Sequence, residues 1–194
     1  MSPWPAKAAL FCYIPGAPSR RHEIFSSRTR GLCKSKRPSL FRASLRDRVI
    51  SRDLLGPVHR VPGIDVGFED EGAVARAAVV VLSFPDLELL ESAVANERIR
   101  FPYVPGLLSF REASAALSAL SKLSVAPDLT LYDGQGYAHP RRFGIACHIG
   151  LLADIPSMGV AKTRLTGEHA PVLKEKGQWV ALTDHDEIIG AVYP

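Results

Sequence analysis

The pattern of apolar and polar positions divides the chain near residue 38. Before that point no period of 2 or 3.6 residues is sustained, and Pro, Ser and Arg dominate, so we predict a basic, disordered extension over residues 1–38. Residues 39–194 carry the pattern of one folded domain, and a chain of 194 residues can bury one core of ordinary size. The first element predicted in this domain is an amphipathic helix over residues 39–54, which Gly56 and Pro57 would end.

Three apolar segments joined by short turns come next. Residues 61–68 have the pattern of a strand, residues 73–84 form a strand apolar enough to be buried on both faces, and residues 87–95 form a third strand. Strands joined by such short turns are most simply an antiparallel meander. Asp65 lies in the middle of the first strand, where its charge must be paired, metal-bound or at the surface.

The second half of the domain alternates helices with strands. Residues 101–106 form a loop that two prolines stiffen, since each proline removes a hydrogen-bond donor and restrains the residue before it. The elements predicted after this loop are a helix over residues 109–123, a strand over 128–133, a helix beginning at Pro140, a strand over 155–160 and a terminal hairpin within 172–193. Ser109 and Glu112 fit the S-x-x-E capping box at the start of the first of these helices.

The order of these elements predicts the fold. Three antiparallel strands followed by helix, strand, helix and strand is the order of a ribonuclease H-like α/β fold, with a mixed central sheet flanked by helices. In that order the fourth strand lies parallel to the first. We therefore expect Asp65 and Asp133 to lie side by side.

Three acids can converge in this fold. Asp65, Glu112 and Asp133 come from a strand, the start of a helix and the end of a strand, and their carboxylates are the ligands that Mg²⁺ or Mn²⁺ prefers. Metal-assisted hydrolysis of a phosphodiester is the natural use of such a set. Each acid also has an ordinary alternative role: Asp65 as a buried hydrogen-bonding acid, Glu112 as the capping-box glutamate, and Asp133 as a turn former before Gly134.

The loop over residues 132–142 concentrates chemistry. It places an acid, two glycines, a histidine and two arginines in succession after an apolar strand, so we predict that it handles metal and phosphate. Arg141 and Arg142 are candidate phosphate contacts, and a solvated helix start is the alternative.

The charge of the chain is unevenly divided. Residues 1–60 hold 13 Lys and Arg against 3 Asp and Glu, whereas residues 61–194 hold 11 against 17. The acidic body suits a metal-binding enzyme better than a protein that coats phosphates, and the basic head either attracts a polyanion or is a solvated arm. Residues 18–48 also have the composition of an organelle transit peptide.

Composition excludes two classes. The cysteines include no C-x-x-C pair, which indicates no zinc site. No apolar run approaches the ~20 residues that a membrane helix needs, so we expect no membrane association. We expect a cytoplasmic monomer.

Four motifs, taken together, resemble the endonuclease V family of deoxyinosine 3′ endonucleases over roughly residues 40–193. The motifs are Gly63-Ile64-Asp65-Val66-Gly67-Phe68, Pro102-Tyr103-Val104-Pro105-Gly106 with Ser109-Phe110-Arg111-Glu112, Asp133-Gly134-Gln135-Gly136 with His139-Pro140-Arg141, and Gly159-Val160-Ala161-Lys162. The resemblance implies a ribonuclease H-like fold, a DNA-repair role and Mg²⁺-dependent cleavage 3′ to deoxyinosine, with Mn²⁺ as a substitute. The ends left would be a 3′-hydroxyl and a 5′-phosphate.

The resemblance also implies a role for each motif. The metal-centred acids would be Asp65, Glu112 and Asp133, and Lys162 would neutralise phosphate charge, although a lysine ending a strand is otherwise usually a surface residue. The rigid wedge where the base is extruded would be Pro102, Tyr103, Val104 and Pro105, or else a stiffened connection with Tyr103 packed on the core. The pocket for the flipped hypoxanthine would be lined by Gly106, Leu108, Gly134 and Gly136, with His139 nearby or simply polar, and Arg141 on phosphate.

The chain departs from the family at its end. The family pattern continues past residues 188–193 into a further strand and helix with a Gly-His motif whose histidine belongs to the active site, and His185 lies in a different context. Residues 39–194 are thus expected to be an endonuclease V-like catalytic domain without that segment. The alternatives are a catalytically weak or inactive protein that binds inosine or branched nucleic acid, an inosine-specific ribonuclease, and another ribonuclease H-like nuclease such as a junction resolvase.

Overall fold

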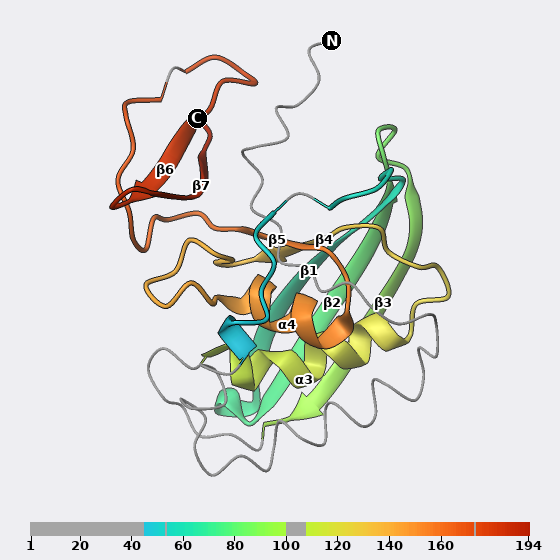
Figure 1. The fold of residues 1–194 in the computed structure, drawn as a ribbon. Helices are drawn as coiled ribbons and strands as arrows, with labels where there is room; N and C mark the ends of the chain where they lie inside the picture. Colours follow the sequence, from blue (N-terminus) through green and yellow to red (C-terminus); the bar gives the residue numbers. More distant parts are fainter. Residues whose placement is uncertain (1–44, 53, 100–107, 173) are drawn as a thin grey trace.

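The computed structural model describes residues 45–52, 54–99, 108–172 and 174–194, and its centre is a five-stranded mixed sheet (Figure 1). The strand order is β3-β2-β1-β4-β5. The elements are β1 (Arg60–Glu69), β2 (Val74–Ser83), β3 (Leu89–Arg98), α3 (Leu108–Ser121), β4 (Thr130–Asp133), α4 (Ile145–Ala153), β5 (Ser157–Val160), β6 (Val180–Asp184) and β7 (Glu187–Val192). The strand β1 is antiparallel to β2 and parallel to β4, which confirms the two pairings that the sequence predicts.

The meander β1-β2-β3 is fixed by a tight turn and one buried face. Asp70, Glu71 and Gly72 all have positive φ in the turn between β1 and β2, so the two strands pair over their whole length. The third strand begins at Leu89 rather than at the predicted residue 87, because Leu87 has φ 59° and belongs to the turn.

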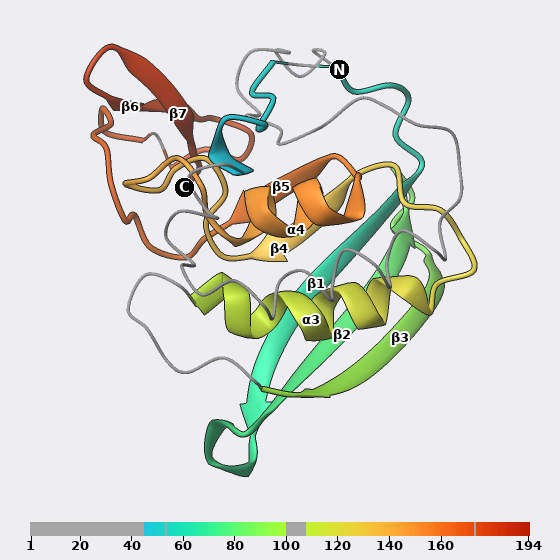
Figure 2. The same cartoon turned by 60° about the horizontal axis from the view of Figure 1, so that its bottom comes forward.

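The prediction that β2 is buried on both faces is wrong. Its burial alternates: Ala75, Ala77, Val79 and Val81 are buried, whereas Val80 is 42% exposed. The helix α3 packs on β2 and β3, and Figures 1 and 2 place both α3 and α4 on one face of the sheet. Alternation of this kind is the ordinary pattern of an antiparallel sheet with one covered face.

The predicted helix over residues 109–123 is confirmed as α3, with its small side chains against the sheet. Its buried stripe is Ala113, Ala116, Leu117 and Leu120. The predicted capping box is wrong, because α3 already begins at Leu108 and Ser109 lies inside it. The Ser109 hydroxyl instead lies 3.1 Å from Nδ1 of the fully buried His148 on α4.

The helix predicted to begin at Pro140 begins five residues later, as α4 at Ile145. Residues 139–142 form a turn in which the Arg142 amide donates to the His139 carbonyl, and Arg142 has φ 52°. The helix ends at Ala153, and the left-handed backbone of the following Asp154 lets the Ile155 amide also donate to the Gly150 carbonyl, at 3.1 Å.

The helix predicted over residues 39–54 is wrong in its described part, and residues 39–44 lie outside the description. Only Leu45 and Arg46 are helical, and amide-to-carbonyl bonds from Arg48 to Leu45 and from Val49 to Arg46 close a single turn. Leu45 packs with Phe143, Cys147 and Leu151 in a small cluster beside α4. The position of residues 45–49 is therefore set by the contact of Leu45 with α4, and not by a continuous amphipathic helix.

The last two strands form a hairpin outside the central sheet. β6 and β7 pair antiparallel around a turn at residues 185–186, as the sequence predicts. Figures 1 and 2 show this hairpin standing apart from the sheet on the β5 side. None of the helices in the described ranges is long and apolar enough to cross a membrane.

Candidate active site

The parallel pairing of β1 with β4 brings two acids to neighbouring strands. Gly63 is opposite Leu131 and Ile64 is opposite Tyr132, so the next residue of each strand is Asp65 and Asp133 respectively. Ile64 and Tyr132 are buried in the core, which leaves the two aspartates exposed by the alternation of the strands. The Val66 amide donates a 2.8 Å hydrogen bond to Oδ1 of Asp65.

Glu112 reaches the same region from α3. Its side chain is buried at 9% exposure, and its neighbour Arg111 fastens the helix to the β1–β2 turn through a 2.8 Å hydrogen bond to the Gly72 carbonyl. Burial, and then the charge of Asp65, raise the pKa of Glu112 to about 7, with Arg111 opposing the rise and Asp133 adding to it. The charges of both aspartates thus act on Glu112, and we call the three carboxylates the acid cluster (Asp65, Glu112 and Asp133).

Lys162 follows β5 and faces the acid cluster. Its Nζ lies 2.7 Å from Oδ2 of Asp133 while its side chain is 84% exposed. The hydrogen bond to Asp133 and the charge of Asp133 raise the pKa of Lys162, with a smaller contribution from Asp65. Lys162 thus brings a positive charge beside the acids while its side chain stays in water.

Glycines pack the start of the 134–142 loop against β5 and α4. The Gly134 amide donates to the Val160 carbonyl at 3.0 Å, and Gly134 has φ 140°. A Cβ on Gly159 would lie 2.3 Å from the Gly136 nitrogen, and one on Gly144 would lie 2.1 Å from the Gln135 carbonyl oxygen. Backbone-to-backbone contact at these distances requires glycine at both positions.

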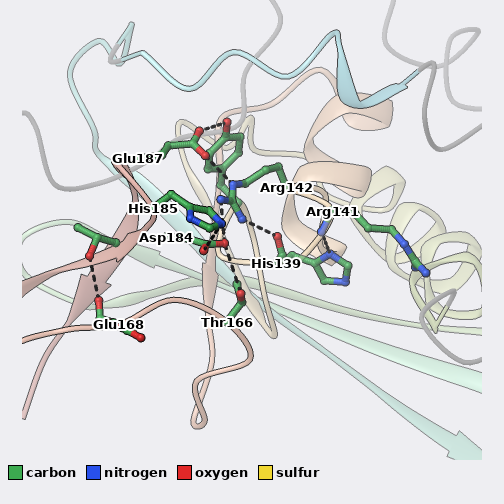
Figure 3. Close-up of polar contacts among 10 residues, drawn as sticks. His139, Arg141, Arg142, Thr166, Glu168, Asp184, His185 and Glu187 are labelled. Atoms are coloured by element: carbon green, nitrogen blue, oxygen red, sulfur yellow. Dashed lines mark hydrogen bonds and ion pairs between the residues drawn. The ribbon is translucent and has the colours of Figure 1, made fainter.

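The second half of the loop carries His139, Arg141 and Arg142. Nδ1 of His139 accepts a 3.0 Å hydrogen bond from the Arg141 amide, and Figure 3 shows the Arg141 side chain pointing away from Arg142. Arg142 is only 12% exposed and forms ion pairs with Asp184 at 2.9 Å and Glu187 at 2.7 Å. This corrects the expectation that Arg142 contacts phosphate, because its guanidinium already faces two carboxylates of the hairpin.

A cavity of about 360 Å³ lies between this loop, the end of β5 and the hairpin. Of the residues predicted to form the site, it brings together Gly136 and Lys162. The predicted wedge over residues 102–105 and Gly106 lie outside the described residues, and Leu108 begins α3. Tyr137, Asp184 and Glu187 also lie around this loop although no motif in the sequence marks them, and the local signal for the two acids is their position on either side of a hairpin turn.

The acid cluster has the donor chemistry for a divalent cation. Hard cations prefer carboxylate oxygens, and a cation would offset both the burial and the charge of Asp65 that raise the pKa of Glu112 to about 7. Among the described residues, however, no three His, Cys, Asp or Glu side chains are already arranged to hold a metal ion. Lys162 bonds one oxygen of Asp133, so a cation would have to share or displace that contact.

Comparison with known proteins gives a consistent family. The family model for endonuclease V matches residues 43–194. The endonuclease V of Trichormus variabilis is 53% identical over 149 residues, which cover 76% of this chain and 67% of that protein. For a Roseiflexus endonuclease V, the matched part is 65% of that protein, so this chain spans about two thirds of the length of these curated relatives.

Solved structures give the same result. The endonuclease V of Streptomyces avermitilis superposes with a TM-score of 0.73 at 38% identity, covering 93% of this chain and 74% of that one. The Ciona intestinalis endonuclease V, solved with a 23mer DNA containing an inosine followed by a ribo-adenosine, has a TM-score of 0.56 at 27% identity and covers 76% of this chain and 60% of that one. The predicted ribonuclease H-like fold is thereby confirmed. With a matching family model over its whole described part, the chain belongs to the endonuclease V family.

Proposed function

We propose that the protein is a metal-dependent endonuclease that hydrolyses the phosphodiester 3′ to deoxyinosine in DNA. The observation that carries the proposal is the convergence of Asp65, Glu112 and Asp133, from β1, α3 and β4, beside Lys162. These are the residues that the family motifs select, and a relative of known structure was solved with inosine-containing DNA.

The acid cluster would hold Mg²⁺, with Mn²⁺ as a substitute. When bound, the cation supplies positive charge that activates water and stabilises the leaving oxygen of the phosphodiester. Glu112, with its pKa near 7, would give up its proton as the cation binds. Lys162, whose side chain is 84% exposed, would turn from Asp133 toward the substrate phosphate and neutralise its charge.

The 134–142 loop would receive the base. Gly134 and Gly136 let the loop backbone pack closely where it meets β5, and they would line the pocket for the flipped hypoxanthine, whose edge backbone amides can read at close range. His139 would stand near this pocket and Arg141 would contact phosphate. Tyr103 and the prolines around it would hold the strands apart, and Gly106 and Leu108 would complete the pocket.

The test is a nicking assay on paired oligonucleotides. One duplex carries a single deoxyinosine and the other carries deoxyadenosine at that position, and each is incubated with Mg²⁺, with Mn²⁺ or with a chelator. We expect a nick 3′ to deoxyinosine that leaves 3′-hydroxyl and 5′-phosphate ends, that requires the cation and that Asp133→Asn abolishes. Equal cleavage of both duplexes, or cleavage that survives the chelator, would reject the proposal.

One observation favours a second candidate. Because the described residues hold no three ligating side chains in place for a metal, binding of inosine-containing nucleic acid without cleavage is the alternative function. A gel-shift assay on the same deoxyinosine strand, and on an RNA strand with one inosine, separates the candidates. Binding of either strand without a nick would favour the binding protein, and cleavage of the RNA alone would favour an inosine-specific ribonuclease.

A further inference from the structure

Side-chain contacts hold the β6–β7 hairpin against the rest of the domain. In the described part of the chain it shares no strand pairing with the five-stranded sheet. Backbone hydrogen bonds between Glu168 and Thr183 tie it to the segment that precedes it, which is itself a loop. A two-stranded hairpin alone is marginally stable in water. Other contacts must therefore hold it beside the site.

Arg142 supplies two ion pairs between the hairpin and the 134–142 loop. Its Nη2 lies 2.9 Å from Oδ2 of Asp184, the last residue of β6, and its Nε donates to Oε2 of Glu187, the first residue of β7, at 2.7 Å. The two acids are opposite each other across the hairpin turn. Figure 3 shows the guanidinium between them, so one side chain forms ion pairs with both strands.

The same guanidinium is bonded back to its own loop. Nη1 donates to the His139 carbonyl at 3.2 Å, and the guanidinium carbon lies 5.9 Å from the ring centre of Tyr137. The Tyr137 hydroxyl donates to the second oxygen of Glu187 at 2.6 Å. We call this set the arginine cluster (Tyr137, Arg142, Asp184 and Glu187).

Only arginine can make this set of contacts. Its planar group directs donors from three nitrogens toward Asp184, Glu187 and the His139 carbonyl at once, whereas a lysine ammonium is a single point charge. At 12% exposure, little water can replace the donors if they are removed. Asp184 and Glu187 would then face each other without the charge that joins them.

The arginine cluster joins the two elements that line the cavity from different parts of the chain. The 134–142 loop contributes Gly136, Tyr137 and Ala138 to the lining, and the hairpin and its end contribute Ile189, Gly190 and Tyr193. We infer that Arg142 is a positioning residue, which fastens the β6–β7 hairpin to the 134–142 loop and so sets the width of the cavity beside Lys162. The inference concerns the architecture of the site, and only its substrate readout rests on the proposed function.

Hydrogen–deuterium exchange tests the fastening directly. In Arg142→Met we expect the amides of residues 180–192 and 136–138 to exchange on the order of tenfold faster than in the wild type, with a smaller increase in Arg142→Lys and Glu187→Gln. The matched control is Arg76→Met. It removes an ion pair between Arg76 of β2, which is 54% exposed, and Glu69 at the end of β1. Unchanged exchange in all three cluster variants would overturn the inference, and the two conservative ones keep it testable if Arg142→Met does not fold.

Kinetics on a deoxyinosine oligonucleotide provide the second readout. A cavity with a loose wall should bind substrate less well, so we expect KM to rise about tenfold in Arg142→Met with kcat within about twofold, and a partial return in Arg142→Lys. A lower thermal midpoint with unchanged KM and unchanged exchange in residues 136–138 would reduce Arg142 to a stabilising residue and overturn the inference. If the wild type does not cleave, the proposed function fails, while the exchange experiment still decides the role of Arg142.

Discussion

The acid cluster and the arginine cluster lie at the two ends of one loop and use charge in opposite ways. In the acid cluster, burial and then the charge of Asp65 raise the pKa of Glu112 to about 7. In the arginine cluster one guanidinium joins two carboxylates at 2.9 and 2.7 Å, and the pKa of Glu187 is lowered, first by the Tyr137 hydrogen bond and then by that of Arg142. The negative charge of the acid cluster exceeds the positive charge beside it, as expected of a site that binds a cation. In the arginine cluster a positive charge lies between the two acids, as expected of a contact that holds two elements together.

The largest effect is expected from Asp65→Asn, which removes one charge from the acid cluster and leaves the arginine cluster intact. If the cluster holds the cation, the rate of nicking at deoxyinosine should fall by about 10³-fold or more, whereas Arg142→Met should act through KM. The measurement is the initial rate at saturating substrate, with circular dichroism to show an unchanged fold. A loss of less than about tenfold would place the chemistry away from this cluster.

Gly159→Ala tests the close packing of the loop that connects the two clusters. The new Cβ would lie 2.3 Å from the Gly136 nitrogen and 2.5 Å from the Gly134 carbonyl oxygen, so the loop must move. We expect a loss of about 3 kcal/mol in the free energy of unfolding, measured by urea denaturation. The matched control is Gly67→Ala in β1, where a Cβ meets nothing within 4 Å and stability should be retained. Equal stability of the two variants would contradict the packing described for the loop.

Glu112→Gln measures how much the buried charge of Glu112 lowers the free energy of unfolding. The folded pKa of about 7 exceeds the ordinary value of 4.5, so the unfolded chain loses its proton first as pH rises. Wild-type stability should therefore fall between pH 4.5 and about 7 and change no further from this group above that window. In a chelator, the variant should become more stable than the wild type by up to about 3 kcal/mol at pH 8, and this advantage should vanish near pH 4.5.

Thermal midpoints of both proteins across that range provide the measurement. An advantage of Glu112→Gln that does not depend on pH would mean that Glu112 is not the group that titrates. Added Mg²⁺ should reverse the order at pH 8 by stabilising the wild type more than the variant, because the cation needs the carboxylate.

The smallest effect is expected in the arginine cluster at acid pH. The folded pKa of Glu187 is depressed by Tyr137, Arg142 and the more distant Arg46, so its contribution is present above the ordinary value of 4.5 and is lost as pH falls through the folded pKa. Because Glu187 is 44% exposed, the contribution should not exceed about 1 kcal/mol. The thermal midpoint of the wild type should approach that of Glu187→Gln as pH falls below 4.5; a constant gap would show that the ion pair does not hold the hairpin.

The sheet and the acids could be predicted because their signals are local. The alternation in β1 and the apolar run before Asp133 mark two strands, and the order of elements then dictates that those strands are parallel neighbours. The stripe of alanines and leucines in α3 likewise identifies the face that packs on the sheet. The order of elements thus predicts which strands and which helix carry Asp65, Glu112 and Asp133, and the role of these acids stays a prediction.

The arginine cluster could not be predicted because its partners are distant in sequence. Arg142 resembles any arginine before a helix until the hairpin brings Asp184 and Glu187 to it. Ser109 fits a capping box in sequence, yet the structure gives its hydroxyl to His148 on another helix. The sequence predicts a start of α4 at Pro140 rather than Ile145 for a related reason, since the turn at residues 139–142 is closed by bonds from the Arg142 amide and guanidinium to the His139 carbonyl.

The parallel pairing of β1 with β4 also orders events during synthesis of the protein. The meander β1-β2-β3 uses contacts between neighbours in sequence, so it can form as soon as its three strands have left the ribosome. Asp65 is part of that meander, whereas α3, β4 and then Lys162 are synthesised after it. A nascent or prematurely terminated chain can therefore carry a folded sheet edge without yet assembling the acids beside Lys162.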